Sequence, residues 1–65
     1  MTVNDFVSVI STDIEIFIVF RNGERIDGFD VWKYESRLVP EETLDSEILK
    51  IETSEDHEEW LITVK

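Results

Sequence analysis

The sequence predicts an α+β domain in which a short N-terminal helix packs on a four-stranded, mainly antiparallel sheet. An apolar stripe with helical spacing opens the chain, an Asn-Gly pair separates two strand-like segments, and two further strand-like segments end it. A helical turn is expected to join the two resulting hairpins. With 65 residues, the chain is long enough for one domain, residues 1–65.

The first predicted element is a helix with Thr2 as its N-cap and Asp5 at the reciprocal position of a capping box. Apolar residues then recur at i, i+3, i+4 and i+7, namely Val3, Phe6, Val7 and Ile10. The helix is expected to end at residues 11–13. Because so short a helix is not stable alone, it must dock on the sheet.

The first hairpin is predicted from a strand at residues 14–20, the type I′ turn pair Asn22-Gly23 and a partner strand at residues 24–34. A two-residue turn places Phe20 opposite Arg25 and Ile16 opposite Phe29. The face that carries Ile16 is then expected to seat the helix. A bulge at Gly28 would change this register.

The second half of the chain predicts a helical turn at residues 40–45 and strands at residues 48–53 and 59–64. Pro40 is expected at the first helical position, and the turn is expected to be anchored by Leu38, Val39 and Leu44. In the hairpin, one strand matches the other across a loop at residues 54–59. In this antiparallel arrangement, Thr53 is expected opposite Trp60, Ile51 opposite Ile62 and Leu49 opposite Val64.

Charge is the most informative feature for function. The chain has 16 acidic and 6 basic residues, a net charge of −10, and nine of the acids fall within residues 41–59, where Lys50 is the only base. That stretch therefore carries about −8. A protein that binds nucleic acid or an anionic membrane needs a basic surface, so we expect neither as a direct partner.

The acidic stretch has two interpretations. It is either a solvated surface that aids solubility or a surface that a basic partner protein recognises. Because it falls on predicted folded elements rather than on a tail, its carboxylates would keep fixed spacings, as phosphates do along a duplex. The candidate binding residues are Glu41, Glu42, Asp45, Glu47, Glu52, Glu55, Asp56, Glu58 and Glu59.

Catalytic and metal-binding patterns are weak. His57 is the only histidine and lies in an acidic loop without a visible pocket, so we expect no enzyme activity. The chain has no cysteine, no EF-hand spacing and no phosphate-binding loop. We therefore expect no metal and no cofactor. No apolar stretch is long enough to span a bilayer and no signal-peptide pattern opens the chain, which favours the cytoplasm.

A second hypothesis concerns the sheet face that the helix is not expected to cover. One short helix covers only one face, so the other would need a second copy of the chain or a partner protein. The candidate interface residues are Phe17, Val19, Ile26, Trp32 and Tyr34. In this structural-module interpretation, a homodimer forms and acidity serves solubility. A small-ligand sponge with a pocket at the dimer seam is a third interpretation.

Two segments carry a family resemblance: Met1-Thr2-Val3-Asn4-Asp5-Phe6-Val7, followed by an Ile-rich strand and an Asn-Gly hairpin, and the turn from Val39 to Ile48. In these, the chain resembles small acidic proteins encoded by bacteriophages and prophages of Gram-positive bacteria. Some such proteins are anti-CRISPR or anti-restriction inhibitors, and several mimic DNA. The resemblance implies a cytoplasmic inhibitor that occludes a basic site on a host nucleic-acid enzyme.

Overall fold

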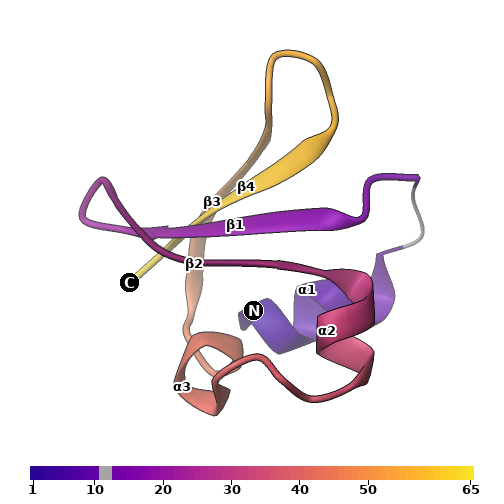
Figure 1. Cartoon of the computed structure of the whole chain (residues 1–65). Helices are drawn as coiled ribbons and strands as arrows, with labels where there is room; N and C mark the ends of the chain where they lie inside the picture. The colour runs from indigo at the N-terminus through magenta and orange to yellow at the C-terminus, as the bar shows by residue number, and fades with distance from the viewer. Residues whose placement is uncertain (11–12) are drawn as a thin grey trace.

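The computed structural model describes residues 1–10 and 13–65. The elements in chain order are α1 (Val3–Val9), β1 (Ile16–Arg21), β2 (Glu24–Asp30), α2 (Val31–Glu35), α3 (Glu41–Leu44), β3 (Ile48–Thr53) and β4 (Glu59–Val64). The strands form one sheet in the order β2-β1-β4-β3 (Figure 1). Two antiparallel hairpins meet through a parallel pairing of β1 with β4. The predicted α+β class is confirmed, with a mixed sheet.

Helix α1 begins as the sequence predicts. The Thr2 hydroxyl accepts a hydrogen bond from the Asp5 amide (3.1 Å), and the Asp5 carboxylate accepts one from the Thr2 amide (3.0 Å). This is a complete capping box. The hydrogen bonds from the Thr2 amide and hydroxyl lower the pKa of Asp5. The helix ends at Val9 with an extended Ile10 as its C-cap, slightly before the predicted end at residues 11–13. Residues 11 and 12 lie outside the described residues.

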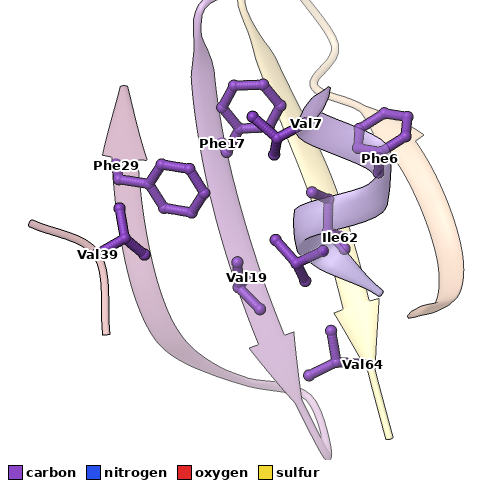
Figure 2. Packing of buried hydrophobic residues seen from close by; sticks show 9 residues of the cluster. Phe6, Val7, Phe17, Val19, Phe29, Val39, Ile62 and Val64 are labelled. Carbon is purple, nitrogen blue, oxygen red and sulfur yellow. The ribbon is translucent and has the colours of Figure 1, made fainter. Parts of the chain in front are cut away.

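The face of β1 that α1 covers is the opposite of the predicted one. Phe17 and Val19 are 1% and 0% exposed beneath the helix, whereas Ile16 on the other face is 43% exposed. In Figure 2, Phe6 and Val7 of α1 lie over the sheet beside Phe17. The core therefore lies between α1 and the face that carries Phe17.

A bulge in β2 explains part of this reversal. Phe20 pairs with Arg25 as predicted, but Val19 pairs with Asp27, so Ile26 has no partner on β1. One extra residue moves the rest of β2 to the other face. Phe29 consequently joins Phe17, and the two rings stack with their centroids 5.3 Å apart.

The parallel partner of β1 explains the rest. Strand β4 places Trp60 beside Phe17 and Ile62 beside Val19, whereas Glu59 lies beside Ile16. The apolar residues of β4 thus extend the face that carries Phe17. Burying that face removes more apolar surface from water than burying the other would.

Helix α2 replaces the predicted end of the second strand. Asp30 accepts a hydrogen bond from the Lys33 amide (2.9 Å) and so caps a helix rather than continuing β2. The helix ends at Glu35 with Ser36 as its C-cap, Arg37 beyond it adopts a positive φ of 58°, and the Leu38 amide bonds back to the Lys33 carbonyl. Trp32 therefore lies on a helix, not on a strand.

The predicted helical turn and second hairpin are largely confirmed. Val39 is buried and Leu44 packs against the core, but Leu38 is 75% exposed and is not an anchor. Pro40 is the N-cap of α3 rather than its first residue. Strands β3 and β4 have the predicted bounds, and the pairs of Thr53 with Trp60 and Ile51 with Ile62 are as expected.

The predicted partner of Val64 is the exception. Ile48 pairs with Val64, because the register of β3 shifts between Ile48 and Lys50. Leu49 is left out of the pairing by this irregularity and is 63% exposed. The open end of β3 therefore carries an apolar side chain outside the core.

Two neighbouring substitutions in β1 test the face assignment. Phe17→Ala should lower the free energy of unfolding by about 3–5 kcal/mol, because it removes a fully buried ring. Ile16→Ala should lower it by less than about 1 kcal/mol, because that side chain remains partly in water. Urea denaturation followed by circular dichroism measures both. An equal decrease in the free energy of unfolding for the two variants would contradict the placement of α1 over the face that carries Phe17.

Candidate functional site

Eight of the nine candidate carboxylates form two groups, one at each end of β3. Eight of the nine are exposed and Glu59 is half-buried. In Figure 1, α3 lies at one end of β3 and the β3–β4 loop projects from the other end, away from the helices. We define the α3 group as Glu41, Glu42, Asp45 and Glu47. The loop group is Glu55, Asp56, Glu58 and Glu59, and Glu52 lies between them on β3.

These carboxylates have little neutralisation from basic side chains. In the part of the chain that the structure describes, the single ion pair joins Lys50 to Glu52 within β3. Both of its side chains are more than one-third exposed, so it contributes little stability. The α3 group and the loop group therefore present their charge directly to solvent.

The loop group is held in place by the Ser54 hydroxyl. This hydroxyl donates to Asp56 Oδ1 (2.7 Å) and accepts from the amides of Glu58 (3.2 Å) and Glu59 (3.1 Å). The His57 amide bonds back to the Ser54 carbonyl (2.9 Å), and His57 itself has a positive φ of 59°. These contacts fix the backbone from which the four carboxylates project.

The same contacts act on Asp56. The hydrogen bond from the Ser54 hydroxyl, followed by that from the Glu58 amide, lowers the pKa of Asp56. Asp56 therefore stays ionised to a lower pH than an ordinary aspartate does. His57 is exposed, and its Nδ1 shares a hydrogen bond with the Thr53 hydroxyl (3.1 Å). Across residues 1–10 and 13–65, no cluster of three His, Cys, Asp or Glu side chains could hold a metal ion.

The α3 group is attached to the sheet by two buried hydroxyls. The Ser46 hydroxyl accepts from Arg21 Nη2 (2.9 Å) and donates to the Glu42 carbonyl (2.8 Å). The Thr43 hydroxyl donates to Asp27 Oδ2 (3.2 Å). Arg21 comes from β1 and Asp27 from β2, so the sequence spacing gives no signal of these two contacts. They fix α3, and its acidic side chains, against the first hairpin.

A pocket of about 640 Å³ lies beside the α3 group and was not predicted from the sequence. The Tyr34 hydroxyl on its wall donates to Asn4 Oδ1 (2.7 Å) and shares a hydrogen bond with the Ser8 hydroxyl (2.8 Å). Tyr34 and Glu35 on its wall belong to α2, most of which the sequence predicts as a strand. Its lining residues are Asn4, Tyr34, Glu35, Arg37, Glu41 and Leu44.

The structure does not bring the predicted interface residues together on one open face. Phe17 and Val19 are buried within the chain's own core, so they are not accessible to a second copy. Tyr34 is half-buried and packs against that core. Ile26 and Trp32 are exposed, but one lies at the bulge of β2 and the other on α2. The prediction was wrong for Phe17 and Val19 because it exchanged the two sheet faces.

Comparison with protein-family models, curated proteins and solved structures finds no match for this chain. Among the described residues, the helices are all too short or too polar to cross a membrane. The function must therefore be inferred from the chemistry of the acidic surface and its support.

Replacing Ser54 with Ala tests whether the loop group is fixed. The pKa of Asp56 should rise toward its ordinary value because its main hydrogen-bond donor is lost. The amides of Glu58 and Glu59 should also exchange faster with solvent. An NMR titration with hydrogen exchange measures both.

Asp5 is the internal control for this variant. Its lowered pKa depends on Thr2 and not on Ser54, so it should not change. An unchanged pKa of Asp56 in the Ser54→Ala variant would show that the Ser54 hydroxyl does not hold the loop.

Proposed function

We propose that this chain is a non-enzymatic, phage-type binding protein that inhibits a host nucleic-acid-processing enzyme by covering its basic site. The observation that supports this most is the placement of nine carboxylates on folded elements. They are mostly exposed and, apart from Glu52, form no ion pair with a basic side chain in the described part of the chain. Enzymes that bind nucleic acid present basic grooves to phosphates. A fixed array of carboxylates presents to such a groove the same negative charge as the phosphates of nucleic acid. The enzyme would be a defence enzyme in the host cytoplasm, and DNA mimicry is the form of inhibition that we propose.

The geometry favours a groove over a single pocket as the contacted surface. Strand β3 has six residues, which at about 3.3 Å per residue separates the α3 group from the loop group by roughly 20 Å. A partner that contacts both groups must therefore extend along the hairpin. The hydrogen bonds of Ser54 fix the loop group before binding, which reduces the entropy lost in the complex.

The pocket beside α3 suits the same kind of partner. Its charged lining residues are Glu35, Glu41 and Arg37, two carboxylates and one guanidinium. This lining favours a cationic side chain over an anionic nucleotide. The pocket therefore supports a basic protein partner more than the small-ligand sponge. The alternative homodimer through the first hairpin is less favoured, because Phe17 and Val19 are buried in the chain's own core and cannot contact a second copy.

Displacement of duplex DNA from purified restriction and RNA-guided nucleases tests the proposal. Fluorescence anisotropy of a labelled duplex should show release at a one-to-one ratio of this chain to the nuclease. The inhibition should weaken as salt rises from 0.05 M to 0.5 M, because mobile ions screen exposed charges. Reversing Glu55, Asp56, Glu58 and Glu59 to Lys should weaken inhibition at least about tenfold, because each reversal removes an attraction of about 0.2–1 kcal/mol and adds a repulsion of similar size.

A control variant separates position from net charge. Reversing Asp13, Glu15 and Glu24 to Lys changes the net charge as much as reversing Glu55, Asp56 and Glu58 does, but these three residues lie outside residues 41–59 and do not line the pocket beside α3. It should leave inhibition within about threefold of the wild type. An equal loss of inhibition in the two variants would show that net charge, and not the position of the carboxylates, causes the effect. Absence of displacement from every nuclease tested would overturn the proposal.

A further inference from the structure

Strand β3 has an open edge, and the backbone groups along that edge have no role in the proposed function. It is the last strand in the order β2-β1-β4-β3, so β4 is its only neighbour in the sheet among the described residues. The N-terminal residues cover the beginning of this edge. Thr2 forms a bridge with Glu47, and the Ile48 amide bonds to the Met1 carbonyl (2.8 Å). The open part is therefore residues 49–53.

The backbone of this open part is oriented for pairing with another strand. The Ser54 amide donates to the Glu59 carbonyl (2.9 Å), so the Ser54 amide points toward β4. In an antiparallel ladder, successive residues direct their amide and carbonyl groups alternately toward and away from the neighbouring strand. Ile51 and Thr53 therefore direct these groups away from β4, into solvent. An exposed row of this kind is a template for a further strand.

The side chains of the open part identify what can pair with it. Leu49 and Ile51 are 63% and 38% exposed, which is apolar surface that pairing would remove from water. Lys50 and Glu52 form an ion pair with each other, so they lie on the same face of β3. Ile51 stands between one basic and one acidic residue. This short sequence is complementary in charge to itself when read in the opposite direction.

We propose that two copies of this chain associate by antiparallel pairing of their β3 strands, with Ile51 opposite Ile51 of the second copy. In this register, Lys50 lies opposite Glu52 of the second copy, and the reverse pair forms by symmetry. Ile51 is also a residue whose backbone groups point outward, so the two copies exchange hydrogen bonds at the symmetry axis. The product is a continuous eight-stranded sheet.

Net charge opposes this association and gives it a distinctive salt dependence. Each copy carries −10, so the two copies repel one another at long range. Salt screens that repulsion more than it screens the short Lys50–Glu52 contacts. The dimer should therefore become stronger as salt rises from about 0.02 M to 0.15 M. Binding to a basic partner should become weaker over the same range, so the two proposals can fail separately.

Cysteine cross-linking tests the register directly, because the chain has no cysteine of its own. Residues opposite one another in a hydrogen-bonded antiparallel pair have Cα atoms about 5.5 Å apart. That separation lies within the range a disulfide spans. Ile51→Cys should form a disulfide-linked dimer under mild oxidation, seen by non-reducing electrophoresis. Trp32→Cys, at a 66% exposed position on α2, is the control for random collision.

Charge exchange tests the pairing without cysteine. Sedimentation equilibrium should show that Glu52→Lys dimerises about tenfold more weakly than Glu24→Lys, which has the same net charge but lies on β2. The Lys50→Glu variant should dimerise more weakly than the Lys33→Glu variant for the same reason. The double variant Lys50→Glu/Glu52→Lys keeps the wild-type charge and should restore the dimer.

The proposal fails if the wild-type chain remains monomeric at millimolar concentration in 0.15 M salt. That outcome would mean that Lys50 protects the edge against pairing, a common role of lysine on edge strands. Cross-linking of Ile51→Cys no faster than that of Trp32→Cys would also overturn it. A dimer that the charge-exchanged double variant does not restore would exclude this register.

Discussion

The fold depends on the parallel pairing of β1 with β4. Neither hairpin has enough apolar surface alone, since the first contributes Phe17, Val19 and Phe29 to the core and the second contributes Ile62 and Val64. Parallel pairing places these residues on one face, where α1 covers them (Figure 2). A chain of this size has little core to spare, so losing this contact would separate the two hairpins. The positions of α3 and the acidic surface follow from it.

The sequence predicts the elements that depend on neighbouring residues. The capping box of Thr2 and Asp5, the Asn22-Gly23 turn and the bounds of β3 and β4 all have local causes, and all are confirmed. Both residues of that turn have positive φ, as a type I′ turn requires. These signals involve residues within one turn or one hairpin, so spacing and residue type are sufficient.

The errors share a different cause. Which face of β1 is buried depends on the extra residue Ile26 and on a partner strand about forty residues away, and no local pattern reports either. Helix α2 was missed because Val31, Trp32 and Tyr34 favour strands by residue type, whereas the Asp30 cap starts a helix. The carboxylates of the candidate site could be named from the sequence. The hydroxyls of Thr43, Ser46 and Ser54 that hold them could not.

We propose that the carboxylates of residues 41–59 form the contacting surface while the rest of the chain supports them. Chemical-shift mapping of the ¹⁵N-labelled chain, titrated with a nuclease from which it displaces DNA, tests this most directly. The perturbed amides should concentrate in α3, β3 and the β3–β4 loop, with the amides of α1 unchanged. Perturbation centred on α1 or on the turn at Asn22 and Gly23 would contradict it.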